Sequence, residues 1–341
     1  MNNIISDMKS YIKYITGALV ALMTLGLVSC EYIHEDLKPC DHYLHFTYTH
    51  NMKFADAFQH ELVCQEEAKT AELFIFDGDG KFLSSQSLPT ETLQENRIRL
   101  NLDPGKYKLL AWAGLNDTDY TWTKPASGES MDEWLMSVRQ DKGVVARELS
   151  GLFQGTLELT IPSGGETDTE FPLVKNTNKI RLALIDANSG TGLQADDFTI
   201  LATTHNGDLN AQNQPVADDA VLWKPYLQQV ETVADTEGGT AMQAVVAELN
   251  TMRLMDGSRT SLQLSHKGEE APFLQVDLTD FLLLTQMESH DLDAQEYLDR
   301  QDEYTIVVYL DIVGGKAHCL EIIVNDWTIR LDDVNLGGKE A

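Results

Sequence analysis

The sequence predicts an all-β protein made of antiparallel sandwiches with few short helices. Short runs rich in apolar, aromatic and β-branched residues recur along the chain, turn signals separate many of them, and runs with helical spacing are rare. Strands spaced by roughly 8–12 residues and more favour antiparallel sandwiches over a parallel sheet with crossover helices.

The first residues have the layout of an export signal. Lys9 and Lys13 give a weakly basic start, and an apolar run from residue 15 to residue 28 follows. This run is shorter than the roughly 20 apolar residues that a membrane-spanning helix needs. We therefore expect it to direct export and not to remain as a membrane span.

The apolar run ends at Leu27-Val28-Ser29-Cys30. This segment resembles the bacterial lipoprotein box, which implies removal of residues 1–29 as a signal peptide and acylation of Cys30, as with palmitate. Residues 30–41 would then form a lipidated tether. The alternative is a secreted, soluble protein in which Cys30 is an ordinary thiol.

Charge and cysteine content limit the partners. The formal net charge of −29 disfavours nucleic acid and anionic membrane surfaces. Membrane attachment would therefore rest on acyl chains, of which two or more are needed for stable anchoring. Of the other cysteines, Cys40 and Cys64 form a possible disulfide, which export permits, and Cys319 is left over. We find no Cys/His spacing typical of zinc.

The first half of the chain contains strand-like runs joined by turn signals. They are YLHFTY (43–48), AELFIFD (71–77), RIRLNL (97–102), KYKLLAWAGL (106–115) and GLFQGTLELTI (151–161). Gly78-Asp79-Gly80 connects the second run to KFLSSQSL (81–88), which predicts a β-hairpin. The polar stretch 162–170 predicts a domain boundary, so we expect domains at 42–165 and 166–341.

The second half repeats this style. Its strand-like runs are FPLVKNTNKIRLALID (171–186), AVVAELNTMRLM (244–255), LQLSHK (262–267), EYTIVVYLDI (303–312) and HCLEIIVNDWTIRLDDVNL (318–336). Polar residues 175–181 predict a turn leading into the second domain. Three segments have weak to fair helical spacing: 131–140, 55–62 and 278–284.

Two segments suggest metal binding but are explained better otherwise. Asp77-Gly78-Asp79-Gly80 is acidic, yet an EF-hand loop that began there would carry Lys81 and Phe82 at positions five and six. A hairpin turn is the better interpretation. Five histidines crowd into one region: His34, His42, His45, His50 and His60. Because residues three apart on a strand face opposite sides, His42 and His45 would not bind one metal.

The sequence indicates no enzyme and no metal or cofactor site, since nucleophile, zinc-protease and phosphate-loop motifs are missing. One dense acidic cluster precedes a strand-like run: Asp291, Asp293, Glu296, Asp299, Asp302 and Glu303. It suggests a solvated loop or helix face, with weak cation binding as the alternative.

Several segments together resemble one family, the fimbrillin-associated anchor subunits of Bacteroidales fimbriae (FimB-like lipoproteins of the major and minor fimbriae). They follow the family's order: SCEYIHEDLKPC (29–40), YLHFTYTHNMKFADAF (43–58), LFIFDGDGKF (73–82), LDPGKYKLLAWAGL (102–115), LVKNTNKIRLAL (173–184), VVAELNTMRLM (245–255), QEYLDRQDEYTIVVYL (295–310) and IIVNDWTIRLDDVNL (322–336). The resemblance covers almost the whole chain after residue 29.

The resemblance implies two tandem transthyretin-like β-sandwich domains. It also implies a lipoprotein on the cell surface, held in the outer membrane by acylated Cys30. Such a subunit sits at the base of a fimbrium, holds the fibre and limits its length, with shaft or accessory pilin subunits as partners joined by strand addition.

The positions of arginine separate an anchor from a shaft subunit in this comparison. The resemblance implies that shaft subunits lose their lipidated end through cleavage after an arginine. Here no arginine occurs between Cys30 and Arg97. A cut at Arg97 would remove two expected strands, so we expect this chain to keep its lipid. A shaft or tip pilin is the alternative within the same system.

A surface glycan-binding lipoprotein of a nutrient-capture system is the alternative from another class. It would need exposed aromatic side chains. The candidates are Trp122, Trp134, Trp223 and Tyr226. Other aromatic residues in strand-like runs are expected in the core: Phe74, Phe76, Trp112 and Trp327.

Overall fold

The computed structural model describes residues 41–50, 53–56, 70–187, 192–216, 219–233, 242–286, 292–325 and 327–329. Residues 42–163 and those from Asp168 onward form one compact unit. Asp41 and residues 164–167 belong to a second, small unit, in which the Thr167 N–H donates to the Asp41 carbonyl at 3.1 Å.

Strands dominate the described residues, as the sequence predicts. The first half contains β1 (His42–Thr47), β2 (Thr49–His50), β3 (Lys53–Asp56), β4 (Ala71–Asp77), β5 (Phe82–Leu88), β6 (Ile98–Leu100), β7 (Gly105–Ala113), β8 (Tyr120–Trp122), β9 (Leu135–Val138), β10 (Val144–Val145), β11 (Phe153–Ile161), β12 (Thr167–Pro172) and β13 (Val174–Lys175).

The second half contains further strands and most of the helices. Its strands are β14 (Thr177–Asp186), β15 (Phe198–Thr204), β16 (Asp208–Asn210), β17 (Val221–Trp223), β18 (Leu227–Val233), β19 (Met242–Met252), β20 (Ser261–His266), β21 (Leu274–Val276), β22 (Glu303–Val313), β23 (Lys316–Val324) and β24 (Trp327–Ile329). The described helices are short: α2 (Thr90–Glu95), α3 (Leu278–Leu283), α4 (Ala294–Asp299) and the 3₁₀ turns η2 (Met131–Glu133) and η3 (Ala195–Asp197).

In the first half, a three-stranded sheet β12-β1-β6 packs on a five-stranded sheet β13-β11-β7-β4-β5. The rings of Tyr48, just after β1, and Phe153 of β11 meet edge to face across the sheets, with centroids 5.4 Å apart. The apolar core between the sheets includes Leu44, Phe46, Leu73, Ile75, Leu109 and Phe171. Gly155 lies on β11, and a Cβ added there would lie 2.4 Å from the Pro172 carbonyl oxygen. Only glycine at this position therefore lets the backbone at Pro172 approach β11 so closely.

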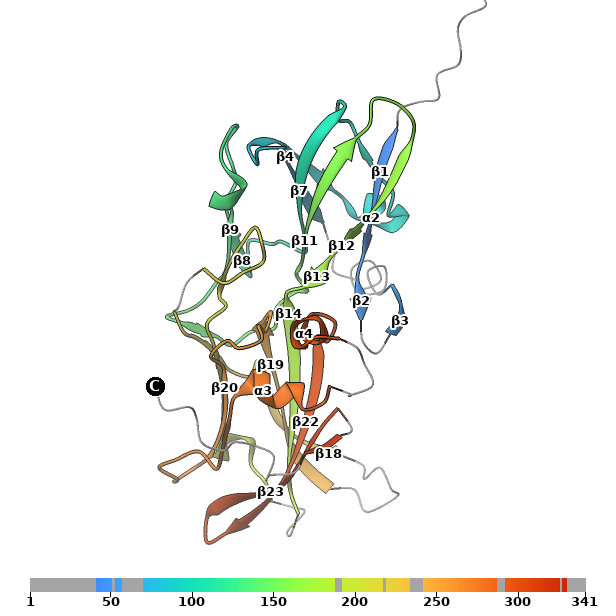
Figure 1. Cartoon of the computed structure of the whole chain (residues 1–341). Coiled ribbons are helices and arrows are strands. Elements are labelled where there is room, and N and C mark those ends of the chain that lie inside the picture. Colours follow the sequence, from blue (N-terminus) through green and yellow to red (C-terminus); the bar gives the residue numbers. More distant parts are fainter. Residues whose placement is uncertain are drawn as a thin grey trace, which may run out of the picture. The chain divides into compact units, whose positions relative to one another are not determined.

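A six-stranded sheet of the second half, β18-β19-β14-β22-β23-β24, faces a five-stranded sheet β10-β17-β15-β20-β21, to which the first half contributes β10. The long strands β14, β19 and β22 run side by side (Figure 1). The core between these sheets includes Leu182, Leu184, Ile200, Leu264, Ile306 and Val308. The same apolar cluster continues to Phe74, Phe76 and Trp112 of the first half.

The fold confirms the all-β sandwich prediction with one change of detail. Most strand pairs are antiparallel, including the predicted β4–β5 hairpin. Within the described residues, β14 pairs with β22 in parallel, as does β10 with β17. A parallel partner must come from far along the chain, and the order of runs in the sequence does not reveal it. Two domains bounded at residue 165 remain a prediction.

Two local expectations were wrong. Residues 131–140 form η2 followed by strand β9, not one helix, because the apolar residues after η2 pair with β8 and β16. Lys175 belongs to β13 and residues 177–181 to β14, so this segment is not a turn. The polar stretch 162–170 includes the start of β12, which pairs with the first-half strand β1.

Of the other two helical segments, 278–284 is confirmed as α3. The Asp277 side chain accepts a hydrogen bond from the Asp280 N–H at 3.0 Å and so caps the helix. The first residues of 55–62 lie in β3, and the rest lie outside the described residues.

Candidate binding site

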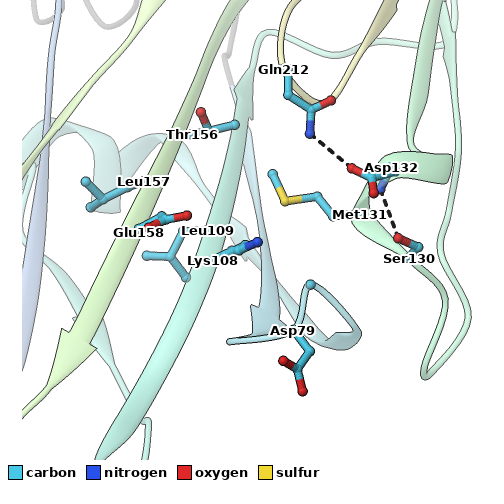
Figure 2. Close-up of a pocket in the computed structure, with 11 residues that line it drawn as sticks. Asp79, Lys108, Leu109, Ser130, Met131, Asp132, Thr156, Leu157, Glu158 and Gln212 are labelled. Carbon is cyan, nitrogen blue, oxygen red and sulfur yellow. Dashed lines mark hydrogen bonds between the residues drawn. The ribbon is translucent and has the colours of Figure 1, made fainter.

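A polar cavity of about 260 Å³ opens on one face of the five-stranded first-half sheet (Figure 2). Strands β7 and β11 form its floor, while the β4–β5 turn, η2 and the loop after β16 form its walls. The lining residues are Asp79, Gly80, Lys108, Leu109, Ser130, Met131, Asp132, Thr156, Leu157, Glu158 and Gln212.

The β4–β5 turn shapes one wall. The Asp77 carboxylate accepts hydrogen bonds from the backbone N–H groups of Asp79 and Lys81, each at 2.9 Å, and Gly80 has a φ of 79°. This arrangement is an Asx turn closed by glycine. The hairpin interpretation of Asp77–Gly80 is therefore confirmed, since the Asp77 side chain is engaged by backbone donors.

A backbone contact ties this turn to the opposite wall. The Met131 N–H donates to the Gly80 carbonyl at 2.9 Å, and the Ser130 Oγ accepts from the Asp132 N–H at 3.3 Å. The Gln212 side-chain amide donates to the Asp132 carboxylate at 3.3 Å (Figure 2). Three chain segments far apart in sequence therefore enclose the cavity.

The charges of the cavity are mostly acidic. Lys108 and Glu158 are directly paired in register on β7 and β11. Asp79 and Asp132 add two further carboxylates. The volume lies below the roughly 300–1,000 Å³ of most small-molecule pockets. The cavity can therefore receive one small polar group, such as a single side chain or sugar ring.

Metal binding finds no support in the residues described. No group of three or more His, Cys, Asp or Glu side chains in the described ranges could hold a metal ion. His42 is buried on β1, whereas His45 faces the other side, with its Nδ1 3.0 Å from an Asp168 oxygen. His34 and His60 lie outside the described residues, as does the side chain of His50.

The acidic cluster 291–303 consists largely of structural contacts. Asp293 caps α4 by accepting from the Glu296 N–H at 2.7 Å. Asp299 takes two hydrogen bonds from the Arg253 guanidinium, at 2.6 and 2.7 Å. Asp302 forms a buried ion pair with Lys175. Solvation was therefore only part of the explanation, and Asp291 lies outside the described residues.

The aromatic residues expected at a glycan platform are mostly not exposed. Trp134 and Trp223 are buried, so they do not provide the exposed aromatic surface that the glycan-binding alternative would need. Tyr226 donates to Glu248 at 2.9 Å, and Trp122 is half-buried. The core interpretation of the other aromatics is confirmed where the side chain is described: Phe74, Phe76 and Trp112 are buried. The Trp327 side chain lies outside the described part.

The cysteine predictions lie mainly outside the structure. Cys30, Cys40 and Cys64 are not among the described residues, so lipidation and the disulfide stay predictions. Cys319 on β23 is a free thiol, and burial raises its pKa to about 11. A thiol with a raised pKa is a weak nucleophile at neutral pH. In the described portion, no helix has both the length and the apolarity to cross a membrane.

The sequence did not point to the cavity. Lys108 and Glu158 meet only through the β7–β11 register, and Gln212 comes from a loop of the second half. The Asp-Gly turn was the only local signal, and it indicated a hairpin without indicating what packs against it.

These sheets define a mainly antiparallel β-sandwich protein with a small surface cavity. Within that class, residues 37–333 match the family described as fimbrillin-A associated anchor proteins Mfa1 and Mfa2. The chain belongs to this family. Members of this family are fimbrial proteins, so the chain has a role associated with fimbriae. No protein with a curated description matches the sequence.

Solved structures share the fold over most of their length. A candidate polysaccharide-binding protein and a candidate adhesin, both from Bacteroides thetaiotaomicron, are each 26% identical to this chain, with TM-scores of 0.72 and 0.73. The alignments cover 86% and 85% of this chain and 98% and 97% of those proteins. The fimbrial anchor protein Mfa2 of Porphyromonas gingivalis is 17% identical, with a TM-score of 0.63 and coverage of 85% and 98%.

Proposed function

We propose that this chain is a cell-surface lipoprotein that anchors a fimbrium to the outer membrane and limits its length. It would hold the basal pilin by β-strand pairing and the membrane by acylated Cys30. The family match over residues 37–333 is the observation that carries the proposal. The ordered sandwich, with several sheet edges, provides the kind of surface that strand addition uses.

The position of Arg97 supports retention of the lipid. Arg97 lies between α2 and β6, and its guanidinium carbon stacks 3.7 Å from the centroid of the Tyr43 ring. Cleavage there would detach β1, which pairs with β6, and β4, which lies between β5 and β7 in its sheet. Because β4 contributes Leu73 and Ile75 to the core, the loss of this segment would unfold the first half.

Deletion of the gene tests the anchoring role. Cells without the protein should shed fibres or carry overlong ones, as measured by fibre length and by the fimbrial protein in the culture medium. Unchanged fibres would contradict anchoring. Replacing Cys30 with Ala should move the protein from the membrane fraction to the soluble one, and a protein that stays membrane-bound would contradict the lipid anchor.

Glycan binding remains the alternative because one relative at 26% identity is described as a candidate polysaccharide-binding protein. The polar cavity beside η2 would be its site. Isothermal titration of the purified protein with a panel of oligosaccharides, compared with a Glu158→Gln variant, separates the two functions. Binding that depends on Glu158, together with normal fimbriae in the deletion strain, would replace the anchor proposal.

A further inference from the structure

The outer edge of β5 is the longest uncharged sheet edge in the described part of the chain. β5 pairs with β4 on one side, from Leu88 opposite Ala71 to Phe82 opposite Phe76. It is the last strand of its sheet. An edge strand presents a row of backbone N–H and C=O groups that another extended chain can pair with.

Other described edges are short or carry protective features. β6, β8, β10, β13, β16, β21 and β24 have two or three residues each. β12 carries Asp168 and Glu170 and ends in Pro172. β18 has seven residues, but Glu231 is charged and pairs with Arg181 at 2.9 Å. The Gln228 side chain of β18 also donates to the carbonyls of Ala195 and Phe198.

β5 lacks these protections. Its sequence, FLSSQSL, contains no charged residue and no proline. Natural edge strands are commonly guarded by lysine, proline or a bulge. The one such device here is a bulge that leaves Leu83 without a register partner, and Leu83 is 48% exposed. The serines Ser84, Ser85 and Ser87 are exposed and small, so another backbone can approach closely.

The first residue of this edge already pairs with a segment of the same chain. The Phe82 N–H donates to the Glu129 carbonyl at 2.8 Å, and the Phe82 carbonyl accepts from the Gly128 N–H at 3.0 Å. Lys81 and Ser130 form an antiparallel bridge beside them. This edge therefore accepts backbone partners at one end, and among the described residues no strand continues the pairing from Leu83 to Leu88.

We propose that the edge from Leu83 to Leu88 is the place where an extended segment of a fimbrial subunit adds as a further strand. Only an extended polypeptide satisfies a row of alternating backbone donors and acceptors. Small or polar side chains on the added strand would fit beside the serines, and one apolar side chain would fit against Leu83. β5 itself carries no charged side chain, and the carboxylate beside it is that of Glu72 on β4, which accepts a hydrogen bond from Ser87 Oγ at 2.7 Å. The inference rests on the proposed anchoring function.

A double substitution tests this edge. Ser85→Lys with Ser87→Lys places charge on the open edge without touching the core, because both side chains are exposed. Ser87→Lys removes the exposed hydrogen bond that Ser87 Oγ donates to the Glu72 carboxylate at 2.7 Å, and the new ammonium group can pair with the same carboxylate. The probe is the shaft subunit purified from the fimbriae of the same cells. We expect its affinity for the full chain to fall by about tenfold or more, with an unchanged melting temperature. The matched control is Gln229→Lys on β18, which should bind as the unchanged chain does.

Unaltered binding by the double variant, or an equal loss in the Gln229→Lys control, would overturn the assignment to β5. Backbone hydrogen exchange gives a second measurement without substitutions. Amides of residues 83–88 that face outward should exchange quickly in the free protein and slowly with the shaft subunit bound. If they are already protected in the free protein, the chain itself occupies this edge and the inference fails.

The anchoring function and the edge fail separately. Fibres that remain normal after gene deletion contradict the function. Fibres that are shed after deletion but retained by the Ser85→Lys, Ser87→Lys strain leave the function standing and exclude this edge.

Discussion

Glu248 lies on β19 where three donors meet one carboxylate. Lys179 Nζ is 3.0 Å and Arg181 Nη1 2.5 Å from its oxygens, and the Tyr226 hydroxyl donates at 2.9 Å. Burial alone would raise the pKa of Glu248, but the hydrogen bonds from Lys179, Tyr226 and Arg181 outweigh it and lower the pKa. The same burial, together with the Glu248 bond, raises the pKa of the Tyr226 hydroxyl far above its ordinary value.

This lowered pKa makes part of the stability depend on pH. Because the pKa of Glu248 is lower in the folded than in the unfolded chain, its contribution is full above the unfolded value and is lost as the pH falls through the folded value. Glu248→Gln should therefore lower the free energy of unfolding by about 1–3 kcal/mol at neutral pH, and by less in acid. Urea unfolding of both proteins across the acid range measures this.

Glu231→Gln is the matched control. Glu231 also pairs with Arg181, at 2.9 Å, but its side chain is 30% exposed. Its loss should cost less than about 1 kcal/mol. A Glu248→Gln deficit that does not shrink toward low pH would show that the carboxylate charge is not its source.

At the scale of single elements, two carboxylates of α4 form ion pairs that should contribute very different amounts to the free energy of unfolding. Arg253 and Asp299 are joined by two hydrogen bonds, with side-chain exposures of 9% and 17%. Glu296 on α4 forms an i,i+4 pair with Arg300, the residue after the helix, and their side-chain exposures are higher, at 40% and 35%. Asp299→Ala leaves the Arg253 charge buried without its partner. We expect a loss of about 3–5 kcal/mol in the free energy of unfolding.

Glu296→Ala should change the same quantity by less than about 0.5 kcal/mol, because exposed pairs on a helix contribute little. Chemical denaturation of both variants gives the comparison. Similar losses in the two would contradict the assignment of the acidic cluster to buried structural contacts.

Element types were predictable wherever the signal was local. The β4–β5 hairpin followed from Gly78-Asp79-Gly80, and α3 from the apolar spacing after Asp277. The segment 131–140 failed because its apolar residues fit both periods. The segment forms a strand because it pairs with strands from elsewhere in the chain: Leu135 lies opposite Asn210, and Met136 opposite Trp122. Residues from distant segments decided this outcome.

The candidate sites were less predictable than the elements for the same reason. Whether an edge is open depends on which strands are absent beside it, and β5 is an edge only because β4 pairs with β7 on its other side. Likewise, the burial of Trp134 depends on its stacking against Trp112, with centroids 4.8 Å apart. Neither the open edge of β5 nor the stacking of Trp134 can be predicted from the residues next to them in the sequence.

At the scale of the whole molecule, buried polar contacts gather where the two halves join. Asn176 lies between β13 and β14, and its N–H donates to the Leu152 carbonyl at 2.6 Å. The side-chain amides of Asn176 and Asn213 exchange two hydrogen bonds, at 2.7 and 2.9 Å. The Gln154 amide of β11 donates to the Ala211 carbonyl at 2.7 Å. Arg253 Nη1 donates to the Asn213 carbonyl at 2.6 Å. Buried amides with reciprocal partners fix a single arrangement, because an unpaired amide is costly.

These contacts and the shared apolar cluster suit a subunit under tension. The cluster takes Trp112 from β7 and Ile306 from β22. If an anchor bears the pull of a fibre, two halves that unfold independently would let the weaker half unfold first under that force. We therefore expect β7 and β22 to unfold together, as one cooperative unit, and not as two domains with separate stabilities.

Native-state hydrogen exchange, followed by mass spectrometry, tests this cooperativity. Peptides from β7 and β22 should give the same free energy of opening for their slowest amides. Asn176→Ala leaves the Asn213 amide without its partner, and we expect it to lower both values equally, by about 1–3 kcal/mol. If only the β22 value falls, or if β7 opens at a distinctly lower free energy, the halves are independent domains.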